Sequence, residues 1–254
     1  MSDGIAWPLV LGVLGTVFGS HVATVAVRWP QPASGRSRCD GCGRELGAAE
    51  LVPLLSWTVQ RRRCRTCKGA INPLHPSIEL LGALIGVSAG VAASGWTAVA
   101  GAAFGWLLLA LGSIDFVAFR LPNALTAALA VAGLATGVLL PPPLPDRVIG
   151  GALGFGVLWL AAILYDRIRG RMGLGIGDAK LFGAIGLWLG WRALPAVLLV
   201  ACVAGLVWAL AKRMRHDDRL PLGTLLAGAA FAMWLWSVLA ECGTPSPCLT
   251  LVHN

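Results

Sequence analysis

The chain has 254 residues, of which 57% are hydrophobic and only 13% charged, and its mean hydropathy is +0.75. An ordinary soluble domain, with about 45–50% apolar and about 25% charged residues, is excluded by this composition. We therefore expect a multispanning membrane protein. The net charge of +8 fits basic loops beside anionic lipid, so the expected partner is the lipid bilayer and no nucleic acid is required.

Eight apolar stretches are the predicted transmembrane helices. They cover residues 5–27, 77–94, 96–114, 121–140, 148–165, 180–191, 193–211 and 220–240. Seven of them approach the roughly 20 residues that cross about 30 Å of hydrocarbon, and the sixth is short. The first stretch has no basic residue before it and is expected to be a retained helix rather than a signal peptide.

The basic residues predict the orientation. If the N-terminus is outside and all eight stretches span, 18 of the 20 Lys and Arg residues lie in cytoplasmic loops, and only Arg147 and Arg192 lie outside. Omitting the short sixth stretch would move the cluster from Lys212 to Arg219 outside, so we keep it as a span. Both termini are then expected to be outside.

The polar segments divide the chain into four parts. Residues 1–27 are the first transmembrane helix, and residues 28–76 form the only sizeable polar insertion, which has the size of a small metal-stapled module. Residues 77–240 are the remaining seven-helix membrane domain. Residues 241–254 are an external C-terminal tail.

Four cysteines in the insertion predict a structural zinc site. They form two Cys-x2-Cys pairs, Cys39 with Cys42 and Cys64 with Cys67, separated by 21 residues. Adjacent glycines let the backbone wrap a tetrahedral ion, and four thiolates close its coordination sphere. Two disulfides are the alternative, which a reducing cytoplasm disfavours. In the external tail, Cys242 and Cys248 remain either a disulfide or two free thiols.

Two aspartates lie at the cytoplasmic ends of predicted spans. Asp115 follows the third stretch and Asp178 precedes the sixth, where Gly175 and Gly177 leave room for a substrate backbone. Two adjacent carboxylates hold one proton between them, so one can deprotonate water while the other polarises a peptide carbonyl. The pattern predicts an aspartyl protease, and helix capping by Asp178 is the structural alternative.

Several ordered motifs resemble the type IV prepilin peptidases, bacterial inner-membrane aspartyl proteases. Gly-Ile-Gly-Asp-Ala-Lys-Leu at residues 175–181 is similar to the second catalytic motif of that family, and Asp115 with Leu121-Pro122 is similar to the first. The Arg-Trp-Pro run at residues 28–30, the four cysteines, and Pro76 with Glu79 also stand in the order of the family. The resemblance covers almost the whole chain.

The resemblance implies an activity, its site and its partners. The enzyme would remove the basic leader of prepilin or pseudopilin precursors at the cytoplasmic face of the inner membrane, with Asp115 and Asp178 as the dyad and Lys180 as part of the motif. Members with the cysteine module commonly also methylate the new N-terminus with S-adenosylmethionine. Glu79, a carboxylate inside the second span, is the candidate contact for the new amine or the cofactor.

Two other functions agree with part of the pattern. One is a non-catalytic, zinc-stapled membrane assembly protein of a pilus or secretion system, which would not need both aspartates and both motif glycines. The other is a presenilin-like protease with a Gly-x-Gly-Asp motif, which would not need the four-cysteine insertion.

Overall fold

The computed structural model describes residues 3–30, 37–39, 41–170, 175–215 and 218–242. Eight long helices form its body: α1 (Asp3–Val27), α3 (Leu74–Ala92), α4 (Gly95–Ala118), α5 (Asn123–Thr136), α6 (Leu144–Arg169), α7 (Ile176–Leu189), α8 (Leu194–Ala211) and α9 (Leu222–Cys242). The 3-10 turn η1 (Ala48–Glu50) and the short helix α2 (Leu55–Val59) lie between α1 and α3. Strands are absent from the described residues, which contain two isolated β-bridges. The predicted all-α class is confirmed.

Six of the helices, namely α1, α3, α4, α6, α8 and α9, are long and apolar enough to cross a membrane. The protein is therefore a multi-pass membrane protein. Helices α5 and α7 have 14 residues each, which rise only about 21 Å at 1.5 Å per residue. Whether these two also span stays a prediction. The expected stretch 121–140 was too long, because α5 ends at Thr136 in a turn that leads to Pro141, Pro142 and Pro143.

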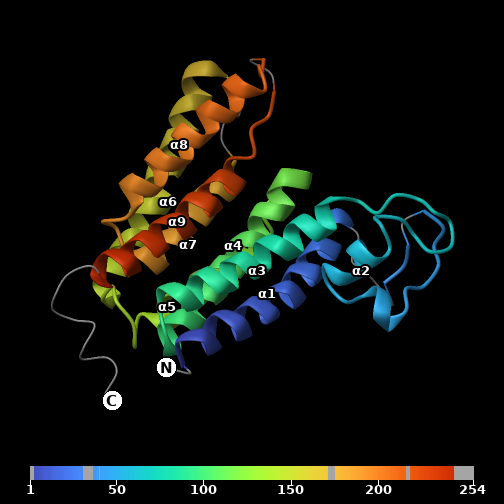
Figure 1. The fold of residues 1–254 in the computed structure, drawn as a ribbon. Coiled ribbons are helices and arrows are strands. Elements are labelled where there is room, and N and C mark those ends of the chain that lie inside the picture. The colour runs from blue at the N-terminus through green and yellow to red at the C-terminus, as the bar shows by residue number, and fades with distance from the viewer. Residues whose placement is uncertain (1–2, 31–36, 40, 171–174, 216–217, 243–254) are drawn as a thin grey trace.

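The helices diverge in two groups, one with α1 and α3 and one with α6, α8 and α9 (Figure 1). The polar insertion, which we call the cysteine module (residues 28–76), lies at the far end of the first group, and the start of α1 and the end of α9 lie on the side where the two groups come together. Helix α1 packs closely on α3. Only glycine fits at two positions of this contact, since a Cβ at Gly82 would overlap the carbonyl of Gly15 and a Cβ at Gly86 would overlap the carbonyl of Leu11. Glycine lets the two backbones approach.

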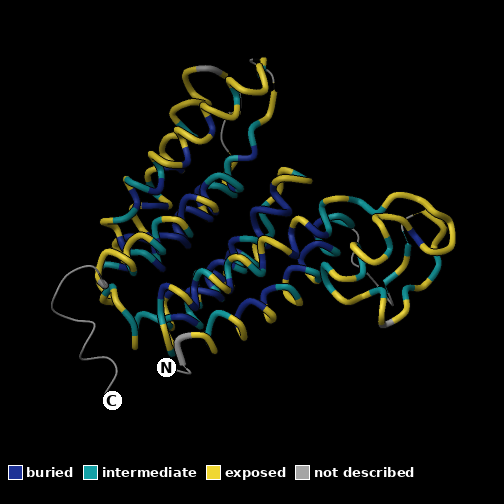
Figure 2. The backbone as a smooth tube through the Cα atoms, in the orientation of Figure 1, coloured by how far each residue is buried: buried dark blue, intermediate teal, exposed yellow. Residues whose placement is uncertain are grey.

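Helix α7 packs against α5, α6 and α9 and buries eight of its 14 residues (Figure 2). Phe182 and Ile185 are almost completely buried. The ring of Trp188 stacks on Phe104 of α4 at 4.7 Å between centroids, and its Nε1 donates a hydrogen bond to Leu129 O of α5 at 2.7 Å. These contacts fix α7, which carries Asp178, relative to α4, which carries Asp115.

Arg147 of α6 is buried, with 2% of its surface exposed. Its guanidinium donates hydrogen bonds to six oxygen atoms, those of Gly133 O, Thr136 Oγ1, Leu140 O, Pro141 O, Pro142 O and Leu187 O. Arg147 thereby joins the ends of α5 and α7 to the start of α6. The sequence predicts that Arg147 lies on the external side of the membrane, which stays a prediction, and it does not indicate that the side chain is buried between helices.

Candidate active site and metal centre

Asp115 lies in the last turn of α4 and is held by α9. Only 5% of the residue is exposed. Its Oδ2 accepts a hydrogen bond from the backbone N–H of Thr224 at 2.9 Å and lies 3.2 Å from Thr224 Oγ1. The hydroxyl of Thr224 also donates to Gly112 O at 2.8 Å. A Cβ at Gly223 would lie 2.9 Å from Asp115 Oδ2, so a glycine is needed where α9 approaches the carboxylate.

Asp178 is the third residue of α7. The N-cap residue of this helix is Gly175 and not Asp178. The carboxylate of Asp178 lies in the first turn and interacts with the backbone N–H of Gly175, so its position agrees with a helix-capping role as well as with a catalytic one. A Cβ at Gly175 would lie 3.2 Å from Asp178 Oδ2, and one at Gly177 would lie 3.3 Å from the Cβ of Leu121. A side chain at Gly175 would therefore crowd the carboxylate of Asp178, and one at Gly177 would crowd Leu121, in the segment that follows α4.

The two aspartates, 63 positions apart in the sequence, lie close enough for their carboxylates to interact electrostatically. The connection from α4 to α5 contributes to this approach, because Leu121 lies against Gly177 of α7 and also against Gly223 of α9. Beside them, Lys180 Nζ donates a hydrogen bond to Asn123 Oδ1 at 2.9 Å. Such a pair of carboxylates can share one proton and activate a water molecule.

Thr224 was not identified from the sequence. It lies 109 residues after Asp115 in an apolar stretch, and a single threonine there gives no signal in the hydrophobic pattern. Its role becomes visible only when α4 and α9 are placed together.

The four sulfur atoms of Cys39, Cys42, Cys64 and Cys67 lie within 4.8 Å of one another. All four cysteines are free, so the disulfide alternative is not supported. The Sγ atoms of Cys39 and Cys67 are 3.8 Å apart, close to the roughly 3.8 Å edge of a tetrahedron with Zn–S bonds of about 2.3 Å. The cluster can hold a metal ion such as zinc. The pair Cys242 and Cys248 lies outside the residues whose side chains are described.

The two cysteine pairs sit in backbone turns of the same design. In the first, Cys39 N donates to Arg44 O and Gly43 N donates to Cys39 O, at 2.8 and 2.9 Å. In the second, Cys64 N donates to Gly69 O and Lys68 N donates to Cys64 O, at 2.9 and 3.1 Å. Gly43 and Lys68, at equivalent positions, both have positive φ. Each turn therefore presents its two sulfur atoms in the same way.

Glu50 joins the two turns. Like Thr224, it was not predicted from the sequence to have a role. Its carboxylate lies 2.7 Å from Arg44 of the first turn and 3.9 Å from Arg65 of the second, and it accepts a hydrogen bond from Gly47 N at 2.9 Å. The Arg44 guanidinium and the Gly47 N–H lower the pKa of Glu50 to about 2. The backbone N–H groups of Cys67 and Thr66 lower the pKa of Cys64 to about 6, which favours the thiolate that binds metal.

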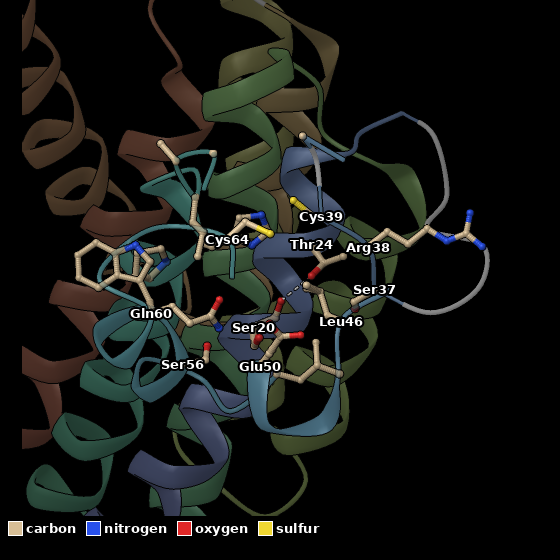
Figure 3. Close-up of a pocket in the computed structure, with 18 of the residues that line it drawn as sticks. Ser20, Thr24, Ser37, Arg38, Cys39, Leu46, Glu50, Ser56, Gln60 and Cys64 are labelled. Atoms are coloured by element: carbon tan, nitrogen blue, oxygen red, sulfur yellow. Dashed lines mark hydrogen bonds between the residues drawn. The ribbon is translucent and has the colours of Figure 1, made fainter. Parts of the chain in front are cut away.

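A cavity of about 140 Å³ separates the cysteine module from α1 and α3 (Figure 3). Its wall includes Ser20 and Thr24 of α1, Glu50 and Trp57 of the module, and Glu79 of α3. The buried Trp57 Nε1 finds no hydrogen-bond acceptor within the described part of the chain. The dyad aspartates do not line this cavity, so the molecule has two separate candidate sites.

Glu79 is buried, with 8% exposed, and one of its carboxylate oxygens is already used. Oε2 accepts a hydrogen bond from Leu54 N at 2.7 Å, which ties the module to α3. The predicted contact with an amine or a cofactor therefore depends on the remaining acceptor capacity of this carboxylate and stays a prediction.

Two family models match successive parts of the chain, one with the cysteine module and one with the two aspartates. Residues 13–93 match the model of the bacterial peptidase A24 N-terminal domain, and residues 102–210 match that of the type IV leader peptidase family. No solved structure matches the chain.

Similar proteins include three that are named prepilin leader peptidase/N-methyltransferase. The protein from Aeromonas salmonicida is 39% identical, over 79% of this chain and 71% of its own length. That from Burkholderia pseudomallei is 42% identical, over 78% and 66%, and that from Stutzerimonas stutzeri is 32% identical, over 92% of both chains. The chain belongs to the type IV leader peptidase family.

Proposed function

We propose that this protein is a membrane aspartyl endopeptidase that removes the basic leader peptide from type IV prepilin-like precursors. The observation that carries the proposal is that Asp115 of α4 and Asp178 of α7 lie near each other, with Leu121 packed against Gly177 next to Asp178 and against Gly223 next to Asp115. The type IV leader peptidase match and the names of the relatives support the same activity. They do not favour a non-catalytic assembly protein or a presenilin-like protease.

In the proposed mechanism the two carboxylates share one proton. The ionised member takes a proton from water, which attacks the scissile carbonyl, while the protonated member donates a hydrogen bond to the carbonyl oxygen. Asp115 Oδ2 already accepts a hydrogen bond from Thr224 N, which stabilises negative charge on this carboxylate. We therefore assign the ionised role in the resting dyad to Asp115 and the protonated role to Asp178.

The membrane is the bacterial inner membrane and the dyad faces the cytoplasm. Eighteen of the 20 basic residues then lie inside, with both termini outside. The substrates are prepilins or pseudopilins, whose basic leader is followed by an apolar helix that remains in the bilayer. The dyad, at the cytoplasmic ends of α4 and α7, would meet the bond between these two segments.

The test is leader removal by Asp178→Asn and Asp115→Asn enzymes in vesicles with a prepilin precursor. Each variant keeps the shape of the side chain but cannot share the proton, so cleavage should fall by at least about 10²–10⁴-fold. Asp166→Asn, which changes an exposed aspartate of α6, is the matched control and should cleave normally. Normal cleavage by a well-expressed Asp178→Asn enzyme would exclude the dyad.

We further propose that the cavity beneath the cysteine module serves N-methylation with S-adenosylmethionine. The relatives carry N-methyltransferase in their names, and the cavity is separate from the dyad. Two lining groups suit this cofactor or the amine: the buried Trp57 Nε1 is a donor without an acceptor among the described residues, and Glu79 has a carboxylate oxygen that Leu54 N does not use. When bound, the cofactor supplies an electrophilic methyl group. Glu79 would hold the newly exposed N-terminal amine.

This second activity is tested by the mass of mature pilin and by direct binding of the cofactor. Pilin processed by this enzyme alone should carry the mass of one added methyl group. In Trp57→Phe, binding of radiolabelled S-adenosylmethionine in equilibrium dialysis should weaken by about tenfold, as expected for one lost hydrogen bond to a buried group, while leader removal continues. A cut but unmethylated N-terminus would leave the chain a peptidase only.

A further inference from the structure

The cysteine module exposes a compact set of large apolar side chains on one segment. The exposed fractions of Leu51, Val52, Leu55 and Val59 are 45%, 43%, 59% and 62%. Helix α2 buries none of its residues, and Leu55 and Val59, four residues apart, share one face of it. In a part of the protein that otherwise exposes polar and basic side chains, these four residues need an apolar neighbour.

The position of this segment along the spans is fixed by Leu54. Its N–H donates a hydrogen bond to Glu79 Oε2 at 2.7 Å, and Glu79 is the sixth residue of α3, about 7.5 Å along the helix from its start. Gly19 of α1 packs at the same level, where its Cβ would lie 2.8 Å from Glu79 Cα. Gly19 is eight residues before the end of α1, or about 12 Å. Leu54, which stands between the apolar residues in the sequence, is therefore attached beside two candidate spans rather than beyond their ends.

Three arginines follow the apolar residues directly. Arg61, Arg62 and Arg63 are exposed, and Arg61 and Arg62 both have positive φ, so the chain turns sharply here. The guanidinium of Arg62 lies 4.8 Å from the ring centre of Trp57. Residues 51–63 contain no acidic side chain. Apolar side chains bordered by arginines are typical of segments that lie in the interface of an anionic membrane.

We propose that residues 51–63, the interfacial segment, insert into the cytoplasmic leaflet beside α1 and α3. The apolar side chains of Leu51, Val52, Leu55 and Val59 enter the boundary between headgroups and acyl chains, and the three arginines bind the phosphates of anionic lipids. The module is then held on the membrane surface by lipid as well as by its connections to α1 and α3. This inference does not depend on the activity proposed above.

The first experiment maps lipid contact in the full-length, zinc-loaded protein. The protein is reconstituted in phosphatidylethanolamine and phosphatidylglycerol vesicles whose phosphatidylglycerol carries a diazirine on the acyl chain, irradiated and digested with trypsin. The four apolar residues fall in one peptide, residues 45–61. We expect adducts on these residues and none on Thr66 or Ala70, exposed residues of the second cysteine turn. Labelled α1 and α3 with an unlabelled 45–61 peptide would overturn the proposal.

Two sets of variants sharpen the result, each with a matched control. Leu55→Asn with Val59→Asn should reduce adducts on the segment by at least about tenfold, whereas Leu55→Met with Val59→Ile should not. Because Leu55 and Val59 are exposed, the zinc content of both variants should equal that of the original protein, which verifies that the module is folded. Unchanged labelling of the Asn variant would contradict insertion.

The arginines are tested by lipid composition. Arg61→Gln, Arg62→Gln and Arg63→Gln together should remove the preference of the segment for phosphatidylglycerol over phosphatidylcholine. The same number of changes at Arg213, Arg215 and Arg219, in the loop before α9, should leave that preference intact. A third arm adds a prepilin precursor. If residues 51–59 carry no lipid adducts but are protected from alkylation at introduced cysteines when the precursor is added, the segment is a docking surface for the substrate and the lipid proposal is wrong.

Discussion

The cysteine module and the helical body are stabilised by different means. In the body, Leu111 of α4, Ile185 of α7 and Leu226 of α9 are completely buried, and they form part of one large apolar cluster. In the described part of the module, Cys64 is the one hydrophobic residue that is buried. The module depends instead on four sulfur atoms, the polar bonds of Glu50 and its attachment through Glu79.

Because of this difference, the stability of the module and the stability of the helical body should depend on different residues. Apolar packing keeps the dyad helices together whether or not a metal is present. A module with almost no apolar core would depend on the metal ion that its four sulfur atoms can hold. The two candidate sites should therefore fail independently, and the following changes are arranged from the largest expected effect to the smallest.

Removal of zinc should give the largest and most local effect. The apparent binding free energy of a structural zinc site is about 10–16 kcal/mol at neutral pH, so Cys64→Ser with Cys67→Ser should unfold residues 37–71. Hydrogen exchange measured by mass spectrometry should show fast exchange there and unchanged protection in α4 and α7. Equal loss of protection in both regions would mean that the body depends on the module.

Arg147→Met should have the largest effect on the body. The change removes the donor for six oxygen atoms and leaves several buried carbonyls without partners, at a cost of at least about 3 kcal/mol. Unfolding in detergent should occur at a lower temperature, with the zinc content retained. Arg192→Met, which removes an exposed arginine from the same end, is the control. If both variants unfold alike, the buried hydrogen bonds are not important.

Thr224→Val should affect the dyad and not the fold. It removes the hydroxyl beside Asp115 Oδ2 but keeps the backbone N–H that donates at 2.9 Å. A loss of about 1.4 kcal/mol would slow leader removal about tenfold. Thr224→Ser retains the hydroxyl and should cleave normally. Equal rates for the Val and Ser variants would show that the N–H alone positions the carboxylate.

Glu50→Gln should produce the smallest effect. It preserves the size of the side chain but weakens the ion pairs with Arg44 and Arg65, whose guanidinium groups are partly exposed and whose attraction is screened by solvent. Zinc should therefore transfer to a chelator a few times faster, while leader removal is unchanged. Glu45→Gln, which alters an exposed pair with Arg38 at 3.4 Å, should match the original protein.

The sequence predicted those features that depend on a short motif or on local composition. The apolar stretches correspond one to one with the long helices, and the Cys-x2-Cys spacing brings four sulfur atoms together. The two aspartates lie near enough to interact electrostatically, and their catalytic roles stay predictions. All of these features rest on local patterns, either helical periodicity or the spacing of ligands within one turn.

Contacts between distant residues could not be predicted in this way. Thr224 approaches Asp115 only because α9 packs on α4, and Arg147 is buried only because α5, α6 and α7 meet around it. The early end of α5 depends on a turn at residues 137–140 that the apolar sequence conceals. For Thr224 and Arg147 the contacting residues belong to other helices, so the sequence around each residue contains no pattern that predicts the contact.

The hydrogen bonds of Arg147 also constrain the order in which the protein can be assembled. One of its acceptors, Leu187 O, lies 40 residues further along the chain, near the end of α7. Until α7 has been synthesised, this oxygen is absent, and the guanidinium must be hydrated or bound to lipid phosphate. The set of six bonds is complete only when α7 packs against α5 and α6, so this end of the bundle reaches its final structure together with the helix that carries Asp178.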